Sequence, residues 1–230
     1  GTVAALLFGL AVAAGLGLCA LAGYAFATWD EPGVVPFSVL AGMLGVAGIA
    51  GGALGVAVDT QPGQDTTALW GIVPFLVLTL ASVPWMLFAL QYTGRYTRVR
   101  RRTVAAPLVA VPILWATTTG QLRNIGLQIL GTIVSFYVIF LLMVGIYLLV
   151  RTTYEYGHLS LGQGVSLAAA GFAPFFAVNL AGPLASEVRT LAVALFAAGF
   201  VVPLGALALA LFRYDTFEAT PAAGTIGERA

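Results

Sequence analysis

Long apolar stretches separated by short polar connections are the main pattern of this sequence. The hydrocarbon layer of a membrane takes about twenty apolar residues per helix, and stretches of that length recur along the chain. Proline, glycine or charged residues bound each stretch, as is typical of turns. The pattern predicts seven spans, at about residues 3–28, 37–58, 69–93, 103–119, 126–150, 163–181 and 189–212.

Arginine is concentrated in the connection between the third and fourth predicted spans. Five arginines lie between Arg95 and Arg102. Because basic residues accumulate in short cytoplasmic loops, this connection predicts the inner side of the membrane. With an outer amino terminus, Arg123 and Arg189 are the only two of the ten arginines outside. We therefore expect an all-α integral membrane protein of the plasma membrane, a seven-transmembrane-helix bundle with its amino terminus outside and its carboxyl terminus cytoplasmic.

The composition supports a multi-pass protein whose main surroundings are the lipid bilayer. Hydrophobic residues make up 60% of the chain and charged residues 8%, whereas soluble domains hold about 25% charged residues. Nucleic-acid binding needs a basic face on a soluble domain. Here the arginines stand between apolar spans, so we expect no nucleic-acid partner.

The residues required for covalent, metal or cofactor chemistry are scarce. The chain has no lysine, which excludes a retinal Schiff base. A lone Cys19 excludes an internal disulfide and a metal site of several cysteines. The single His158 falls in a predicted loop, and neither a histidine–carboxylate pair in a span nor a glycine-rich phosphate loop is present. We expect no catalytic residue, no metal and no cofactor.

Polar residues within the predicted spans are uncharged. This argues against ion transport and proton pumping, which place ionisable groups inside the membrane. Uncharged polar residues in membrane helices commonly form hydrogen bonds between helices, and a polar pocket is the alternative. The residues in question are Thr79, Ser82, Gln91, Ser135, Tyr137 and Asn179.

Glycines recur on one helical face of the second predicted span. They are Gly42, Gly45, Gly48, Gly52 and Gly55, three or four positions apart. Faces of small residues let helix backbones approach closely in lipid. The face predicts close packing against another helix, with a ligand groove as the alternative.

Aromatic and polar residues at the outer ends of spans three to six suggest a shallow ligand site. An anchoring role at the lipid boundary is the alternative for its tryptophans. The proposed lining is Trp70, Trp115, Thr117, Thr119, Arg123 and Asn124.

The seventh predicted span suggests a route for signal output. Pro203 lies inside it and allows a bend, and Arg213 marks the point where the chain leaves the lipid. A helix that runs unbroken toward the cytoplasm can transmit shifts of about 1–2 Å. A static anchor is the alternative.

Four parts of the sequence resemble one family. They are Trp85–Arg95, Gly145–Arg151, Gln163 with Pro174 and Asn179, and Ala210–Ala223. These parts are similar to the seven-helix membrane region at the amino terminus of archaeal and bacterial sensor histidine kinases. The residues that carry the motif or its structure are Gln91, Tyr92, Gly94, Arg95, Gln163, Pro174 and Asn179.

The resemblance implies a sensory or anchoring module of a signal-transduction kinase, with catalysis elsewhere in the parent protein. It implies residues 1–214 as the sensor, 215–230 as the exit to a PAS or kinase domain, and a homodimer through the full-length protein. The outer turn at Thr117–Asn124 lacks the histidine that the family often has there, and the stimulus is unknown. The alternative is a noncatalytic membrane subunit that docks on another membrane protein through the glycine face.

Overall fold

The computed structural model describes residues 1–59, 69–94, 125–155, 161–185 and 187–217. Within them all regular structure is helical, as predicted. Every one of these helices is long and apolar enough to cross a membrane. The predicted fourth span, 103–119, lies outside the described residues. The helices are α1 (Thr2–Thr28), α2 (Val34–Asp59), α3 (Leu69–Tyr92), α5 (Ile125–Glu155), α6 (Leu161–Leu184) and α7 (Arg189–Phe212).

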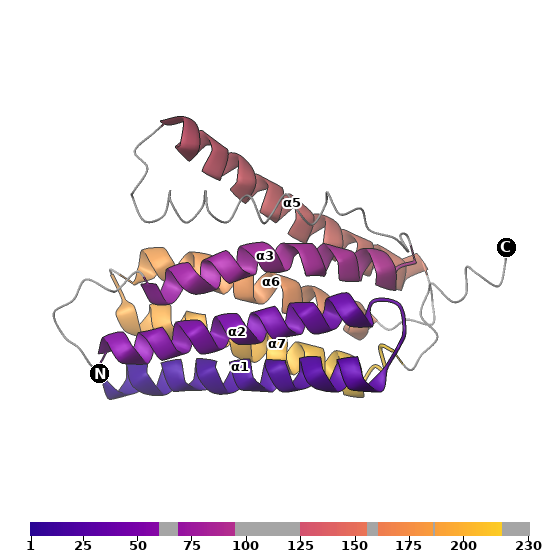
Figure 1. The fold of residues 1–230 in the computed structure, drawn as a ribbon, viewed down its shortest axis with the longest axis horizontal. Coiled ribbons are helices and arrows are strands. Elements are labelled where there is room, and N and C mark those ends of the chain that lie inside the picture. Colours follow the sequence, from indigo (N-terminus) through magenta and orange to yellow (C-terminus); the bar gives the residue numbers. More distant parts are fainter. Residues whose placement is uncertain (60–68, 95–124, 156–160, 186, 218–230) are drawn as a thin grey trace.

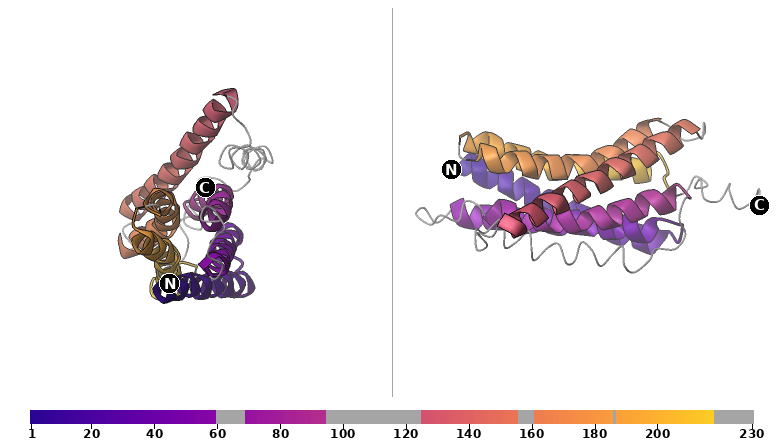
Figure 2. Two further views of the ribbon diagram at one scale, coloured as in Figure 1. Left: turned by 90° about the vertical axis from the view of Figure 1, so that its left-hand side faces the viewer. Right: turned by 90° about the horizontal axis from the view of Figure 1, so that it is seen from above.

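The described helices pack mainly against their neighbours in the chain. Consecutive ones run in opposite directions, except that α3 and α5 run in the same direction. In addition, α7 packs against α1, and α3 packs against both α5 and α6. Figure 2 shows α5 leaning away from the other helices toward its amino terminus. We name the end of the bundle where α7 ends the exit end, and the end where α1 begins the entry end. The ends of α1, α3 and α5 also lie at the exit end.

The glycine face of α2 packs against α1, which confirms the packing prediction. A Cβ atom added at Gly45 would lie 2.6 Å from the carbonyl oxygen of Gly15 in α1. A Cβ atom at Gly52 would lie 2.6 Å from the carbonyl oxygen of Phe8 and 2.7 Å from a methyl of Val12. Only glycine allows the two backbones to come this close. The face is therefore occupied inside the bundle and is not available for docking another protein.

Trp85 connects α3 to the later helices. Its Nε1 donates a hydrogen bond to the carbonyl oxygen of Leu142 in α5, 3.3 Å away. The ring lies against Gly145 in α5 and Gly171 in α6, where a Cβ atom would collide with it. Two parts of the family resemblance, at Trp85 and at Gly145, thus meet in one contact.

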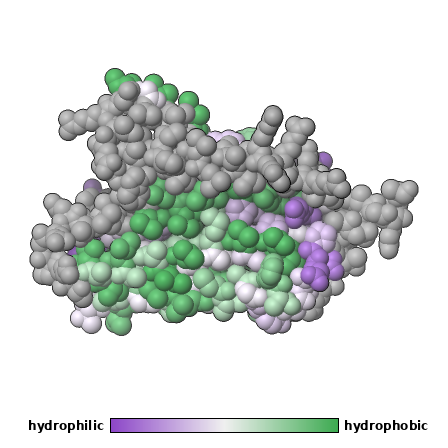
Figure 3. Space-filling view, viewed as in Figure 1, coloured by the Kyte–Doolittle hydropathy of each residue, from purple (hydrophilic) through white to green (hydrophobic). Residues whose placement is uncertain are grey.

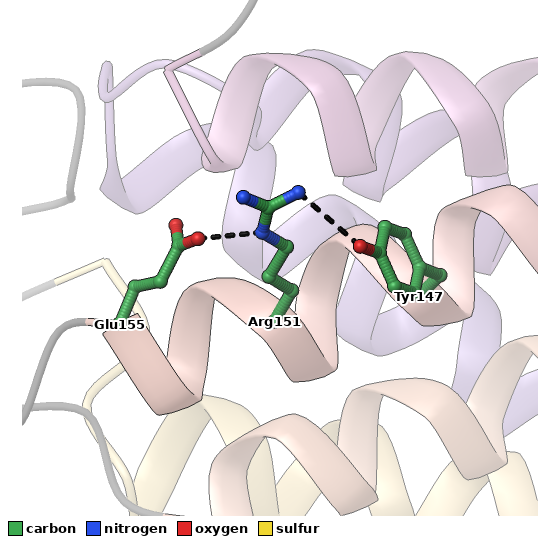
Figure 4. Close-up of polar contacts among 3 residues, drawn as sticks. All are labelled: Tyr147, Arg151 and Glu155. Carbon is green, nitrogen blue, oxygen red and sulfur yellow. Dashed lines mark hydrogen bonds and ion pairs between the residues drawn. The ribbon is translucent and has the colours of Figure 1, made fainter.

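Some helix ends differ from the predicted limits. α2 begins at Val34, because Pro36 fits the first helical turn, where no backbone donor is needed. α5 continues beyond Arg151 to Glu155, within a segment predicted as a loop. Arg151 remains exposed and contacts its own helix (Figure 4): Nε donates to Glu155 Oε1 at 2.5 Å, and Nη1 donates to the Tyr147 hydroxyl at 3.2 Å. These pairs are one helical turn apart and support the last turns of α5.

The chain turns back on itself after α7. The helix ends at Phe212, and the amide of Tyr214 donates to the carbonyl oxygen of Leu209. Asp215 adopts a left-handed conformation with φ 48°, and the amide of Thr216 then reaches the carbonyl oxygen of Ala210 at 3.1 Å. α7 thus ends at the residue predicted for the end of the seventh span, and this turn returns the chain to the exit end of the bundle.

The surface follows the pattern of a membrane protein. In Figure 3 hydrophobic residues cover most of the described surface, and hydrophilic ones gather toward the exit end. Large apolar side chains such as Leu6, Phe136 and Phe140 are more than 60% exposed. Apolar side chains exposed in this way are suited to contact with lipid.

Candidate functional site

The predicted site at the outer helix ends is represented in the structure by Trp70 alone. Trp70 is buried and packs edge to face against Phe8 of α1, at 5.3 Å between ring centroids, and Phe196 of α7, at 5.1 Å. The ring is thus part of the aromatic core of the described helices. Trp115, Thr117, Thr119, Arg123 and Asn124 lie outside the described residues, so the remainder of that site stays a prediction.

The residues of the family motif at the end of α3 form a glycine-terminated helix end. Gly94 has a φ of 70°, a left-handed conformation that favours glycine, and its amide donates to the carbonyl oxygen of Gln91. Gln91 is half-buried, and Tyr92 points into the bundle with an exposure of 3%. Arg95 lies outside the described residues. The left-handed glycine stops α3 and leaves Tyr92 as its last helical residue.

Three polar side chains that are distant in sequence meet at the exit end. The Nε2 of Gln163, in the first turn of α6, donates to the Tyr92 hydroxyl and, at 3.4 Å, to Oγ1 of Thr216. Thr216 Oγ1 donates in turn to the carbonyl oxygen of Ala210 at 2.6 Å. All three side chains are buried. Buried polar groups must be paired to avoid a desolvation cost, so this set links α3, α6 and the segment after α7.

Phe217 lies at the centre of an aromatic group beside these polar residues. Its ring centroid is 5.3 Å from Phe37 of α2 and 5.8 Å from Trp29 at the end of α1. It is 6.5 Å from Phe88 and 6.4 Å from Tyr92, both in α3. Phe217 is 3% exposed. The exit-end cluster, as we call it, consists of Trp29, Phe37, Phe88, Tyr92, Gln163, Thr216 and Phe217.

The exit-end cluster attaches the segment after α7 to the other helices through hydrogen bonds and ring contacts. Its polar groups are an amide and two hydroxyls that are used for hydrogen bonds with one another. Thr216 and Phe217 are thereby in contact with α2, α3, α6 and the end of α1. The first turn of α6 adds to the contact, because a Cβ atom at Gly162 would collide with the Tyr214 hydroxyl.

Only part of this cluster is indicated by the sequence. Tyr92 and Gln163 belong to the predicted family motif, and the structure brings them into contact. Thr216 and Phe217 were predicted to lie in a cytoplasmic exit that begins after residue 214, but they are packed into the bundle. The one indication of their position in the sequence is the aromatic Phe217 that closely follows the polar turn at Arg213–Asp215.

Pro174 and Asn179, the other motif residues of α6, lie away from the exit-end cluster. Pro174 is buried on the side that faces α7, near Gly199. Asn179 is exposed and donates through Nδ2 to the carbonyl oxygen of Phe175 in its own helix at 2.8 Å. Pro203 is buried within α7, and Arg213 is exposed directly after that helix.

Several of the polar residues in the spans form hydrogen bonds within their own helix and not between helices. Thr79 Oγ1 donates to the carbonyl oxygen of Phe75 at 2.8 Å, and Ser82 Oγ to that of Thr79 at 2.7 Å, both within α3. For Thr79, Ser82 and Asn179 the prediction is therefore wrong, because short side chains on a helix reach their own preceding carbonyl more easily than a neighbouring helix.

Three of the polar residues predicted within the spans, Thr79, Ser135 and Asn179, line a small cavity between α3, α5 and α6. Its volume is about 40 Å³. The polar side chains come from three different helices, and the rest of the lining is apolar. This arrangement matches the polar pocket that was the alternative interpretation of these residues. The lining consists of Phe75, Thr79, Ser135, Val138, Ile139, Phe175 and Asn179.

Within the described part of the chain, no group of three histidine, cysteine or acidic residues is placed to hold a metal ion.

Comparison with known proteins gives one match. The family model for the N-terminal 7TM region of histidine kinase matches residues 10–221. No curated protein and no solved structure gave a significant match. The matched region includes all of the described helices except the beginning of α1, and it includes the exit-end cluster. A region of this kind is a sensory membrane module and not a catalytic domain. The chain belongs to the family of N-terminal seven-transmembrane regions of histidine kinases.

Proposed function

We propose that this chain receives a signal in the membrane and passes it to cytoplasmic domains through the segment that follows α7. The observation that carries the proposal is the packing of Thr216 and Phe217 against α1, α2, α3 and α6. The segment that leads out of the bundle is thereby tied to the helices that form it. The family supports a sensory role for the module.

The geometry suggests how the signal is transmitted. Helix shifts of about 1–2 Å are a common switching motion. A shift of α3 or α6 at the exit end would displace Tyr92 or Gln163 and, through their hydrogen bond and the contact with Thr216, the start of the exit segment. Pro203 interrupts the hydrogen-bond ladder of α7 and allows its last turns to follow. Arg213, exposed beside the turn, would hold this end at the lipid headgroups.

The reading frame downstream of residue 230 tests the proposal. We expect it to continue into a cytoplasmic sensor domain or a histidine kinase core. A stop codon directly after residue 230 would contradict the receptor function. We also propose that the parent protein acts as a homodimer in the plasma membrane, which rests on the resemblance to sensor kinases.

The proposed direction of signalling requires the exit end to face the cytoplasm. Among the described arginines, Arg151 and Arg213 lie at or near the exit end and Arg189 at the entry end, which agrees with the predicted orientation. Single cysteines at Gln61, Arg100 and Ala223, in a Cys19→Ala background, report the orientation with a membrane-impermeant thiol reagent. We expect labelling of intact cells at Gln61 alone. If the reagent labelled a cysteine at position 100 in intact cells, the predicted orientation would be wrong.

A further inference from the structure

The cavity between α3, α5 and α6 has the features of a binding site for a ligand that arrives through the lipid. Thr79, Ser135 and Asn179 converge on it from three separate helices. We propose that the cavity binds a neutral, apolar molecule carrying a hydroxyl group, with the hydroxyl in the cavity and the apolar part along α5.

The position of the cavity allows entry from the bilayer. Thr79 and Ser135 lie about 15 Å from the entry-end termini of their helices, at a rise of about 1.5 Å per residue. The cavity is thus inside the span. Ile139 is 44% exposed and Asn179 is also exposed, so these two residues mark the side that opens outward. Toward the entry end α5 leans away from the other described helices (Figures 1 and 2).

The polar groups of the cavity match a hydroxyl. The Thr79 hydroxyl uses its hydrogen for the carbonyl oxygen of Phe75, so its oxygen can still accept. Asn179 uses one amide hydrogen for the carbonyl oxygen of Phe175. Its other amide hydrogen and its Oδ1 have no partner within the described residues. An alcohol can donate to Thr79 or to Asn179 Oδ1 and accept from the remaining amide hydrogen of Asn179.

Size and charge narrow the ligand class further. A volume of about 40 Å³ exceeds the roughly 10–15 Å³ that one water requires, but it holds no more than a polar head and its first carbons. Among the residues that the structure describes, the lining contains no charged side chain. A carboxylate or ammonium group would therefore lose its hydration without a countercharge. Phe75, Phe175 and Val138 provide apolar walls for the attached carbons.

Binding at this site can be tested without reference to signalling, whereas its role as the stimulus site rests on the proposed function. The probe is a diazirine derivative of 1-octanol, added to the protein in phosphatidylcholine nanodiscs and located by mass spectrometry after irradiation. We expect saturable labelling of peptides from α3, α5 or α6 near the cavity. An excess of 1-octanol should displace the probe, and octane, which lacks the hydroxyl, should not.

Substitutions separate recognition of the hydroxyl from partition into lipid. Thr79→Val and Asn179→Leu keep the side-chain size and should each weaken the apparent affinity by roughly 3- to 10-fold, the usual range for a hydrogen bond within a membrane. The matched control is Thr93→Val, because the Thr93 hydroxyl is also buried and also donates to the carbonyl oxygen four residues earlier. This control should bind like the wild type.

A third variant tests the opening of the cavity and leaves its polar groups in place. Ile139→Trp enlarges an exposed residue beside the opening and should lower labelling while the fold, followed by circular dichroism, is kept. Labelling that does not saturate, that octane displaces equally well, or that Thr79→Val and Asn179→Leu leave unchanged would overturn the proposal and assign the cavity to water or lipid. If the probe binds but the parent kinase does not respond, the cavity is a binding site and its role as the stimulus site is wrong.

Discussion

Replacing Gly52 with leucine should prevent α1 and α2 from packing and strongly destabilise the bundle. A Cβ atom at this position would lie 2.6 Å from the backbone carbonyl of Phe8 and 3.1 Å from the amide nitrogen of Val12. Backbone atoms cannot rotate away as a flexible side chain can. Overpacking typically costs about 1–3 kcal/mol and occasionally more, and we expect about 3 kcal/mol or more here. The measurements are the yield of monodisperse protein in detergent and its midpoint of thermal unfolding.

Gly23→Leu is the matched control for this substitution. Gly23 lies on α1, is exposed, and has nothing within 4 Å of the position where its Cβ would be. Leucine is a better helix former than glycine by about 0.8 kcal/mol, so the control should be neutral or slightly stabilising. Equal yields and midpoints for Gly52→Leu and the wild type would show that the close approach of α1 and α2 is wrong.

Truncating Phe217 to alanine should release the segment after α7 from the bundle. A buried phenylalanine contributes about 3–5 kcal/mol relative to alanine, and Phe217 contacts four other aromatic rings. Loss of about 3 kcal/mol corresponds to a roughly 100-fold shift in a local opening equilibrium. Because the amide of Thr216 is hydrogen-bonded to Ala210, its hydrogen exchange should accelerate by roughly that factor.

Phe212→Ala provides the control for Phe217→Ala. Phe212 is the same residue type, is 57% exposed and is the last residue of α7. Its truncation should leave the exchange of the Thr216 amide within about twofold of the wild type, since little buried area is lost. Gln163→Leu should have an intermediate effect, because it removes the hydrogen bonds to Tyr92 and Thr216 but keeps the aromatic contacts. Rapid exchange at Thr216 in the wild type would contradict a docked exit.

The sequence predicts the helices of this protein well because the bilayer imposes their length and composition. The spacing of glycines likewise predicted a close helix contact, since Gly45 and Gly52 lie on one face wherever α2 is helical. The predicted motif residues Tyr92 and Gln163 meet although they are 71 positions apart. Their contact follows from the order of the helices in the bundle, which no local pattern encodes.

Other features could not be predicted because one residue type suits several environments. A tryptophan at the beginning of a span is equally consistent with the lipid boundary and with the core, and Trp70 lies in the core. Thr79 and Asn179 were expected to bond between helices but bond to their own helix, which leaves them to line a cavity. Phe217 follows the polar turn at Arg213–Asp215, so a prediction from hydropathy places the end of the membrane region before this residue.

The most direct test of signal output through the exit-end cluster is autophosphorylation of the parent kinase in membranes. We expect Phe217→Ala to change the rate by at least about tenfold, because a shift of about 1.4 kcal/mol in the coupled equilibrium suffices for that factor. Phe212→Ala should stay within about twofold of the wild type. Equal rates in the wild type and in Phe217→Ala would show that the signal does not pass through the exit-end cluster.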